Sequence, residues 1–170
     1  MKRTIHSKYL FNKKSTPNNY SAPIIVGCKI KTPQNIGSII RLADNVGCKE
    51  VLFIKDDELI RESKIKKTAS SSFNSIKWGF CDMHELETKI PPDYTWVAVE
   101  TTSDSKSIYA TQLPEKIALF VGNEISGIDS DTLTRCREIV HIPLAGNNTS
   151  MNVSHALAVA LLEWQRQQLY

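Results

Sequence analysis

Short apolar runs alternate with amphipathic or polar stretches along most of the chain. Six runs rich in aliphatic residues predict strands, at residues 24–30, 51–54, 76–80, 95–100, 117–121 and 139–142. The run at 117–121 is continuously apolar, which is typical of a strand buried on both faces of a parallel sheet. Between the runs, the pattern predicts helices at residues 36–46, 56–70, 82–89, 129–137 and from 153 onward, and a polar loop at residues 101–111. The alternation indicates an α/β fold with a mainly parallel, six-stranded sheet flanked by helices.

Two of the predicted helices carry clear boundary signals. The helix at residues 36–46 follows a turn at residues 32–35 and ends at Gly47, a residue that readily takes the left-handed conformation after a helix. Its apolar residues Ile36, Ile39, Ile40 and Ala43 fall on one face. In the last helix, either Ser150 or Asn152 can cap the N-terminus by accepting hydrogen bonds from free backbone amides. That helix repeats apolar residues at the spacing of a buried face, namely Val153, Ala156, Leu157, Ala160, Leu161 and Trp164.

Composition and charge divide the chain into an arm and a domain. The chain has 170 residues, 41% of them hydrophobic, which fits one domain spanning residues 22–170 after a polar arm at residues 1–21. Residues 1–43 contain eight lysines and arginines and no aspartate or glutamate, and aromatic residues are interleaved among them. Such an arm is suited to contact a nucleic-acid backbone, and a solvated, frayed tail remains the alternative.

Several classes of protein are disfavoured by what the sequence lacks. No apolar run approaches the roughly 20 residues that span a bilayer, and the basic N-terminus has no apolar signal core. The four cysteines are scattered, so we expect free thiols in a cytoplasmic protein without a metal site. Neither a G-x-G-x-x-G nor a P-loop is present, which argues against an ordinary dehydrogenase or kinase. A flavodoxin-like or other nucleotide-binding protein remains an alternative.

Three polar stretches lie near the carboxyl ends of predicted strands, where ligands bind on α/β sheets. They read PQNIGSIIR (residues 33–41), FVGNEISGI (120–128), and IPL followed after a loop by SMNVS (142–154). Together they resemble, in order and spacing, the three motifs of the SpoU/TrmH family. This family comprises RNA ribose 2′-O-methyltransferases of the SPOUT superfamily, and the resemblance covers about residues 24–166.

The resemblance implies a fold, a cofactor and an assembly. The family's C-terminal segment threads a loop to form a deep trefoil knot, whose loops hold S-adenosylmethionine mainly through backbone groups. Family members work as homodimers, packed through the first-motif and last helices, with RNA as the substrate. Glycine at position 122 would let the backbone approach the cofactor closely. By the family pattern, the cofactor pocket is lined by Thr101, Gly122, Ile142, Leu144 and Met151.

The resemblance also implies the catalytic residues Arg41, Asn35, Glu124, Ser150 and Asn152. In the family, the arginine that matches Arg41 contacts RNA phosphate and is proposed as the base that accepts the ribose hydroxyl proton. A guanidinium stays protonated above about pH 12, so that role would need help from a nearby phosphate. We therefore favour phosphate anchoring and orientation for Arg41.

Each of the other candidates also has a purely structural interpretation. Asn35 opens the first-motif helix, where it can serve as an N-terminal cap. Glu124 can hold Arg41 or Asn35 by a charge-assisted hydrogen bond. Ser150 and Asn152 can fix the loop or touch the substrate ribose. His155 stands where the family usually has a small or apolar residue, and we favour a surface or interface role over proton transfer.

The acceptor RNA is predicted less directly than the chemistry. Larger ribosomal-RNA members of the family often carry an additional N-terminal RNA-binding domain that this sequence does not show. This difference favours tRNA as the substrate, with rRNA as the alternative. A catalytically silent RNA-binding or scaffold dimer of the same fold is a further alternative, against which the presence of all five candidate catalytic residues argues.

Overall fold

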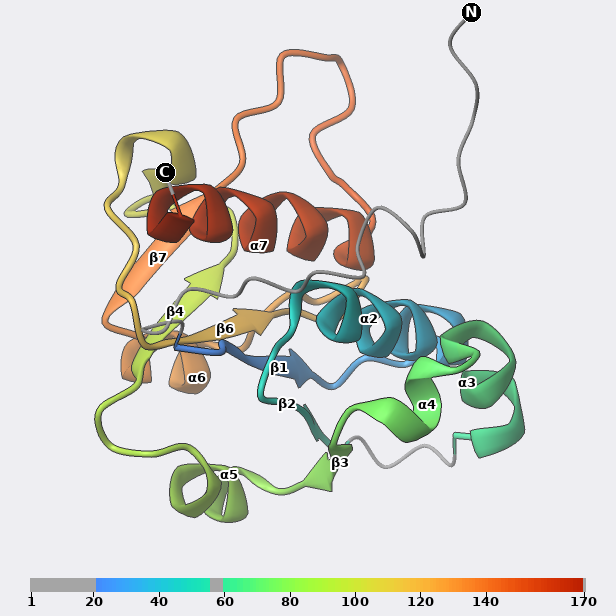
Figure 1. The fold of residues 1–170 in the computed structure, drawn as a ribbon. Helices are drawn as coiled ribbons and strands as arrows, with labels where there is room; N and C mark the ends of the chain where they lie inside the picture. Colours follow the sequence, from blue (N-terminus) through green and yellow to red (C-terminus); the bar gives the residue numbers. More distant parts are fainter. Residues whose placement is uncertain (1–20, 56–59, 170) are drawn as a thin grey trace, which may run out of the picture.

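Seven parallel strands form one sheet, in the order β3-β2-β1-β6-β4-β7-β5 (Figure 1). The computed structural model describes residues 21–55 and 60–169, so the predicted arm lies outside the described residues except for Ser21. In chain order, the strands are β1 (Ile24–Cys28), β2 (Glu50–Ile54), β3 (Trp78–Cys81), β4 (Thr95–Val99), β5 (Lys106–Ser107), β6 (Ile117–Val121) and β7 (Glu138–His141). The predicted parallel α/β sheet is confirmed.

The sheet has one strand more than the sequence predicts. The polar loop predicted at residues 101–111 contains β5 and a short 3₁₀ helix, η1 (Ile108–Ala110). Strand β5 pairs with β7 through Lys106 opposite Val140 and Ser107 opposite His141. The six-stranded prediction is therefore wrong at this edge, because two polar residues carry no alternating hydrophobic pattern from which a strand can be recognised.

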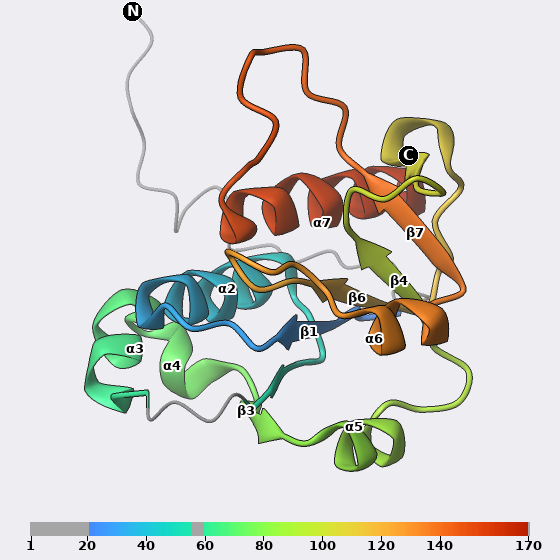
Figure 2. The ribbon, with the colours of Figure 1, turned by 180° about the vertical axis from the view of Figure 1, so that it is seen from behind.

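Helices cover both faces of the sheet (Figures 1 and 2). One face is covered by α2 (Pro33–Val46) and α7 (Val153–Leu169), and α3 (Glu62–Ala69) and α4 (Ser72–Ser75) pack beside α2. The other face is covered by α5 (Met83–Lys89) and α6 (Ser130–Arg135). Each face of the sheet has its own hydrophobic core, and successive strand residues point into one or the other. Ile25 and Leu119 pack with α2 and α7, whereas Ile24 and Phe120 pack on the opposite side.

Helix α2 begins earlier than predicted. Pro33 occupies its first turn, where the missing N–H of proline would have no partner inside the helix anyway. The turn predicted at residues 32–35 is therefore mostly the first turn of the helix. The predicted end is confirmed, since Gly47 has a φ of 78° and its N–H donates to backbone carbonyls of the last turn. The predicted apolar face is also confirmed, because Ile36, Ile39, Ile40 and Ala43 are buried.

Helix α7 begins as predicted and is capped by Asn152. The Asn152 Oδ1 atom accepts from the backbone N–H of Ser154 at 2.9 Å and from its hydroxyl at 2.7 Å. Of the two predicted caps, Asn152 is thus the correct one. The predicted stripe is buried at Val153, Leu157, Ala160, Leu161 and Trp164, whereas Ala156 is only half-buried.

Helix α3 is shorter than the helix predicted at residues 56–70, of which residues 56–59 lie outside the described residues.

The four cysteines are free thiols, and burial raises the pKa of Cys48 and of Cys136 to about 12. Within the described ranges, no helix is both long and apolar enough to cross a membrane.

Candidate active site

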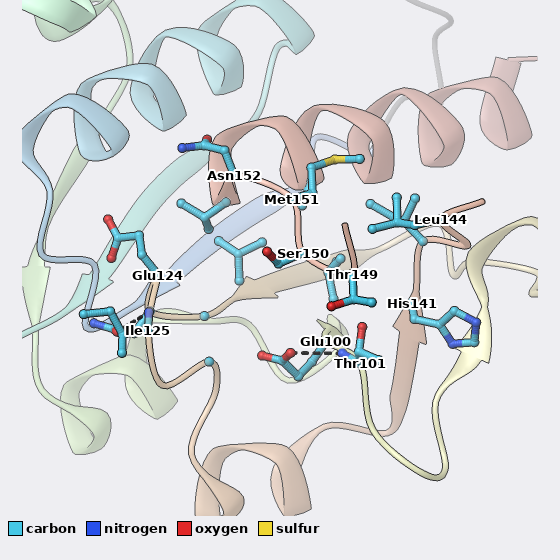
Figure 3. Close-up of a pocket in the computed structure, with 18 residues that line it drawn as sticks. Glu100, Thr101, Glu124, Ile125, His141, Leu144, Thr149, Ser150, Met151 and Asn152 are labelled. Atoms are coloured by element: carbon cyan, nitrogen blue, oxygen red, sulfur yellow. Dashed lines mark hydrogen bonds between the residues drawn. The ribbon is translucent and has the colours of Figure 1, made fainter. Parts of the chain in front are cut away.

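A cavity of about 430 Å³ opens at the carboxyl ends of three neighbouring strands (Figure 3). Its walls come from the end of β4, from the loop after β6, and from the segment that joins β7 to α7. Strand β6 pairs with β4, and β4 pairs with β7, so the parallel arrangement brings all three carboxyl ends to one edge. This position is the one that the sequence predicts for a ligand.

The structure brings all five predicted cofactor residues to this cavity, which is lined by Thr101, Gly122, Ile142, Leu144 and Met151. Of the predicted catalytic residues, Glu124, Ser150 and Asn152 also line it. Ser150 is exposed there, and its N–H and hydroxyl both donate to the Asn148 side chain, which shapes the loop. The volume lies within the range of small-molecule sites, roughly 300–1,000 Å³.

Three of the predicted catalytic residues form one hydrogen-bonded chain. The Asn35 Nδ2 atom donates to Glu124 Oε1 at 2.7 Å, and the Asn152 Nδ2 atom donates to Asn35 Oδ1 at 3.0 Å. A carboxylate can only accept, so the amide of Asn35 must turn its nitrogen toward Glu124 and its oxygen toward Asn152. The chain therefore joins the first-motif helix, the loop after β6 and the start of α7.

Glu124 also serves the N-terminus of α2. Its carboxylate accepts from the backbone N–H groups of Lys31 and Thr32 at 3.3 and 3.2 Å. Thr32, at the cap position, makes no side-chain cap bond of its own. The cap prediction for Asn35 is therefore wrong: Asn35 lies in the third position of the helix, and Glu124 supplies the capping charge from another segment. Of the two partners predicted for Glu124, the structure shows Asn35.

These hydrogen bonds set the ionisation of Glu124. Burial raises the pKa of its carboxyl, but the hydrogen bonds from Asn35, Thr32 and Lys31 outweigh burial and hold the pKa below the ordinary value of 4.5. A carboxyl whose folded pKa is depressed stabilises the fold above its unfolded pKa, and this contribution is lost as the pH falls through the folded pKa. Glu124 is therefore ionised at neutral pH.

We expect Glu124→Gln to lower thermal stability at pH 7 and to have a smaller effect at acid pH. Glutamine keeps one acceptor for Asn35 but loses the charge that serves the start of α2. The melting temperatures of the wild type and the variant should converge as the pH falls from 7 to below 4.5, where protonation removes the same charge from the wild type. Thermal unfolding monitored by circular dichroism would measure both proteins. A gap that stays constant across this range would contradict the role of the charge.

The loop after β6 is a tight hairpin that requires two glycines. Asn123 and Gly127 exchange backbone hydrogen bonds at 3.0 Å, and Gly127 has a φ of 68°. A Cβ atom on Gly122 would lie 2.5 Å from the carbonyl carbon of Gly127. The structure thus gives a second reason for glycine at position 122, because the protein's own hairpin excludes a side chain there. Close approach of a cofactor to Gly122 stays a prediction.

Arg41 and His155 do not contribute to the described wall of this cavity. Arg41 is exposed on α2, six residues after Asn35, which corresponds to about 9 Å along the helix axis. Neither Arg41 nor His155 is among the described residues that line the cavity. His155 is exposed near the start of α7, in agreement with the surface role that we favour.

The sequence does not identify several residues of the cavity wall, among them Glu100, Asn123, Ile125 and His141. His141 Nδ1 lies 3.0 Å from the Ser105 hydroxyl, which belongs to the loop that leads into β5. Asn123 holds the hairpin, because its Oδ1 accepts from the N–H groups of Ile125 and Ser126. The only sequence signal for Glu100 is its place as a charged residue at the very end of an apolar strand.

Comparison with known proteins gives a consistent result. The model of the SpoU rRNA methylase family matches residues 22–162. The chain is 30% identical over 167 residues to a 23S rRNA (guanosine-2′-O-)-methyltransferase of Blochmanniella floridana, which covers 98% of this chain and 66% of the relative. Across the first curated relatives, it spans about three-fifths of their length, from 58% to 66%.

Solved structures show the same fold. The fold is similar to that of the SpoU methyltransferase AviRb from Streptomyces viridochromogenes, with a TM-score of 0.80 and 23% identity over 90% of this chain and 60% of that one. It is also similar to a structure described for 2-OH methylation of C/U34 on tRNA, with a TM-score of 0.77 and 23% identity, covering 88% and 98% of the two chains. The family match covers most of the chain, and the chain belongs to the SpoU rRNA methylase family.

Proposed function

We propose that this protein is an S-adenosylmethionine-dependent RNA methyltransferase that methylates a ribose 2′-hydroxyl. The observation that carries this proposal is the chain of hydrogen bonds from Asn152 through Asn35 to Glu124 at the rim of the cavity. It joins the three segments that match the family's motifs into one site. Membership of the SpoU family and the names of the curated relatives support the same activity.

The residues of the cavity fit S-adenosylmethionine. Thr101, Gly122, Ile142, Leu144 and Met151 all line the cavity, which offers apolar surface beside the open backbone of three strand ends. Leu144 and Met151 are partly exposed large hydrophobic side chains, available to cover an apolar part of a ligand. When bound, the cofactor supplies an electrophilic methyl group on a sulfonium sulfur.

The protein's own groups would orient the acceptor ribose and help its hydroxyl lose a proton. Asn35, Glu124 and Asn152 fix the start of α2 against the cavity, so they hold the polar rim at which the ribose would arrive. Ser150 presents an exposed hydroxyl on the same rim. In this proposal, Arg41 anchors an RNA phosphate, and its positive charge favours ionisation of the hydroxyl.

For the acceptor, the comparisons support rRNA better than the tRNA that the sequence favours. The curated relatives are named for guanosine 2′-O-methylation of 23S rRNA. A fold neighbour whose length is almost fully covered is described for tRNA, which keeps tRNA as the second candidate. We therefore place rRNA first.

The assembly and the knot belong to the same proposal. A homodimer packed through α2 and α7 is supported by Leu162, which is 56% exposed on α7, and by the exposure of Arg41 on α2. Arg41 does not line the cavity of its own chain, so a dimer would allow it to act with the site of the partner. The predicted trefoil knot, formed by the segment after β7, is supported by membership of the family.

Nucleoside mass spectrometry of separated rRNA and tRNA would test the function. A strain that lacks the protein should lose one 2′-O-methylated nucleoside, and reintroducing the gene should restore it. Loss from rRNA would support our first acceptor, whereas loss from tRNA would transfer the proposal to the second. No loss in either RNA, together with no binding of S-adenosylmethionine by the purified protein, would favour a silent RNA-binding dimer.

A further inference from the structure

The wall of the cavity is negatively charged. Two carboxylates line it, those of Glu100 and Glu124, together with one histidine, His141. No lysine or arginine is among the described residues of the wall. A recess of this size with acidic groups and without basic ones favours a positively charged ligand over a neutral one.

The two carboxylates differ in the groups that bind them and in how far they face the cavity. Glu124 is committed to the start of α2, where it accepts from Asn35, Lys31 and Thr32. Glu100, by contrast, is half-buried and faces the cavity from the end of β4 (Figure 3). The charge of Glu100 is therefore the one that remains available to a ligand.

Glu100 is held in place by neutral groups alone. Its Oε1 accepts from the N–H of Thr101 at 3.0 Å, and its Oε2 accepts from the N–H of Ile128 at 3.0 Å. A carboxylate offers about four acceptor positions, so each oxygen keeps one free. In the described part of the chain, no ion pair to Glu100 is present, which leaves a fixed, half-buried negative charge without a counter-ion.

The hairpin after β6 leaves room for this carboxylate by means of a glycine. A Cβ atom on Gly127 would lie 2.6 Å from Glu100 Oε2, closer than side-chain atoms pack. The absence of a side chain at position 127 thus allows the carboxylate to sit between the end of β4 and the hairpin. Its position is set by two separate segments of backbone rather than by a flexible surface.

We propose that Glu100 makes this cavity prefer the positively charged sulfonium donor over the neutral thioether product. This inference rests on the proposed function. S-adenosylmethionine carries one more positive charge than S-adenosylhomocysteine, because its sulfur bears the methyl group as a sulfonium. The remaining charges, on the ammonium and carboxylate groups, are the same in both molecules.

This preference couples binding to the progress of the reaction. In the proposed reaction, the methyl group would pass from sulfur to the ribose oxygen, and the sulfur would keep the electron pair of the broken bond. The ribose hydroxyl would release its proton to water as the new bond forms, and the sulfur would become neutral. The attraction of Glu100 for the sulfur is lost in the same step, so the product is held less tightly than the donor was.

Glu100→Gln tests the inference through binding rather than activity. Glutamine keeps the shape and one acceptor but removes the charge, so we expect the dissociation constant for S-adenosylmethionine to rise about tenfold. The dissociation constant for S-adenosylhomocysteine should change less than about twofold, because its sulfur is neutral. Isothermal titration calorimetry of the full chain with each compound would measure both. Asp129→Asn is the matched control, because Asp129 caps α6 by accepting from the N–H of Thr132, outside the described cavity wall.

The outcomes separate charge recognition from a structural role. If the variant binds both compounds more weakly by the same factor, Glu100 holds the hairpin or the shared ammonium group, and the inference is overturned. If the variant binds both with wild-type affinity, the inference is overturned as well. If the Glu100→Gln variant fails to fold, the wild-type protein tests the inference instead. It should bind S-adenosylmethionine and sinefungin, a cationic analogue, more tightly than S-adenosylhomocysteine. Equal wild-type affinities would overturn the inference, and binding of none of the three would overturn the proposed function with it.

Discussion

Replacing Gly122 with alanine is expected to abolish binding of S-adenosylmethionine. The new Cβ atom would lie 2.5 Å from the Gly127 carbonyl carbon and 2.7 Å from the Ile128 nitrogen, and both are backbone atoms that cannot rotate away. The hairpin must therefore move, and with it Glu124 and the acceptors that face the cavity. Overpacking of this kind costs about 1–3 kcal/mol of folding free energy. We expect cofactor affinity to fall by roughly a hundredfold or more, since displacements of about 1 Å already have large effects at such sites.

The chain offers a matched control for this variant. A Cβ atom on Gly146, in the loop before α7, would have no heavy atom within 4 Å among the described residues. Gly146→Ala should therefore change neither the melting temperature nor the affinity. Isothermal titration calorimetry and thermal unfolding would measure the two variants side by side. Wild-type affinity in Gly122→Ala would show that the hairpin tolerates the clash and that the cavity does not depend on its position.

Replacing Arg41 with alanine should leave cofactor binding intact while reducing methyl transfer by roughly a hundredfold or more. Arg41 is exposed on α2 and lies outside the cavity wall of its own chain, so its loss removes no described contact to the cofactor site. In our proposal it positions an RNA phosphate, and lysine would restore the charge but not the bidentate geometry of a guanidinium. Arg41→Lys should accordingly recover only part of the activity.

Transfer of a radioactive methyl group to RNA, measured beside calorimetric binding of S-adenosylmethionine, would separate the two effects. Lys89→Ala, on α5 at the opposite face of the sheet, is a control that likewise removes one exposed positive charge. If Arg41→Ala lost cofactor affinity, Arg41 would support the pocket rather than the RNA. If it transferred methyl groups at the wild-type rate, the phosphate-anchoring role would be excluded.

The sequence predicts best what local patterns determine. The apolar stripe of α2, the left-handed Gly47 after it and a cap at Ser150 or Asn152 are all read from residues a few positions apart. The first two agree with the structure, which selects Asn152 as the cap. The strand β5 shows the opposite case, because Lys106 and Ser107 pair with β7 only through the geometry of the sheet edge. No local pattern in those two residues specifies that pairing.

In the candidate site, too, local sequence predicts some features and long-range contacts determine the others. The resemblance in three motifs indicates which residues to consider, and the structure brings Asn35, Glu124 and Asn152 together. The hydrogen-bond partner of each residue cannot be predicted from its neighbours in the sequence. Asn35 looks like a helix cap, and only the structure shows that it donates to Glu124, 89 residues away, beside the start of α2. The sequence does not identify Glu100, because a charged residue at a strand end becomes informative only when the opposite wall of the cavity is known.

The hydrogen bond between Asn152 and Asn35 joins residues 117 positions apart in the chain. Strand β6 likewise pairs with β1 although more than half of the chain separates them, so the middle of the sheet is completed late. Contacts of such long sequence separation slow folding, because the entropy of closing a long loop must be overcome before the contacts form. During synthesis on the ribosome, residues 24–127 would emerge with half of the described cavity wall, before the segment from β7 to α7 that supplies the other half. We therefore expect cofactor affinity to appear only when α7 has docked, so that the ability to bind the methyl donor marks a fully folded chain.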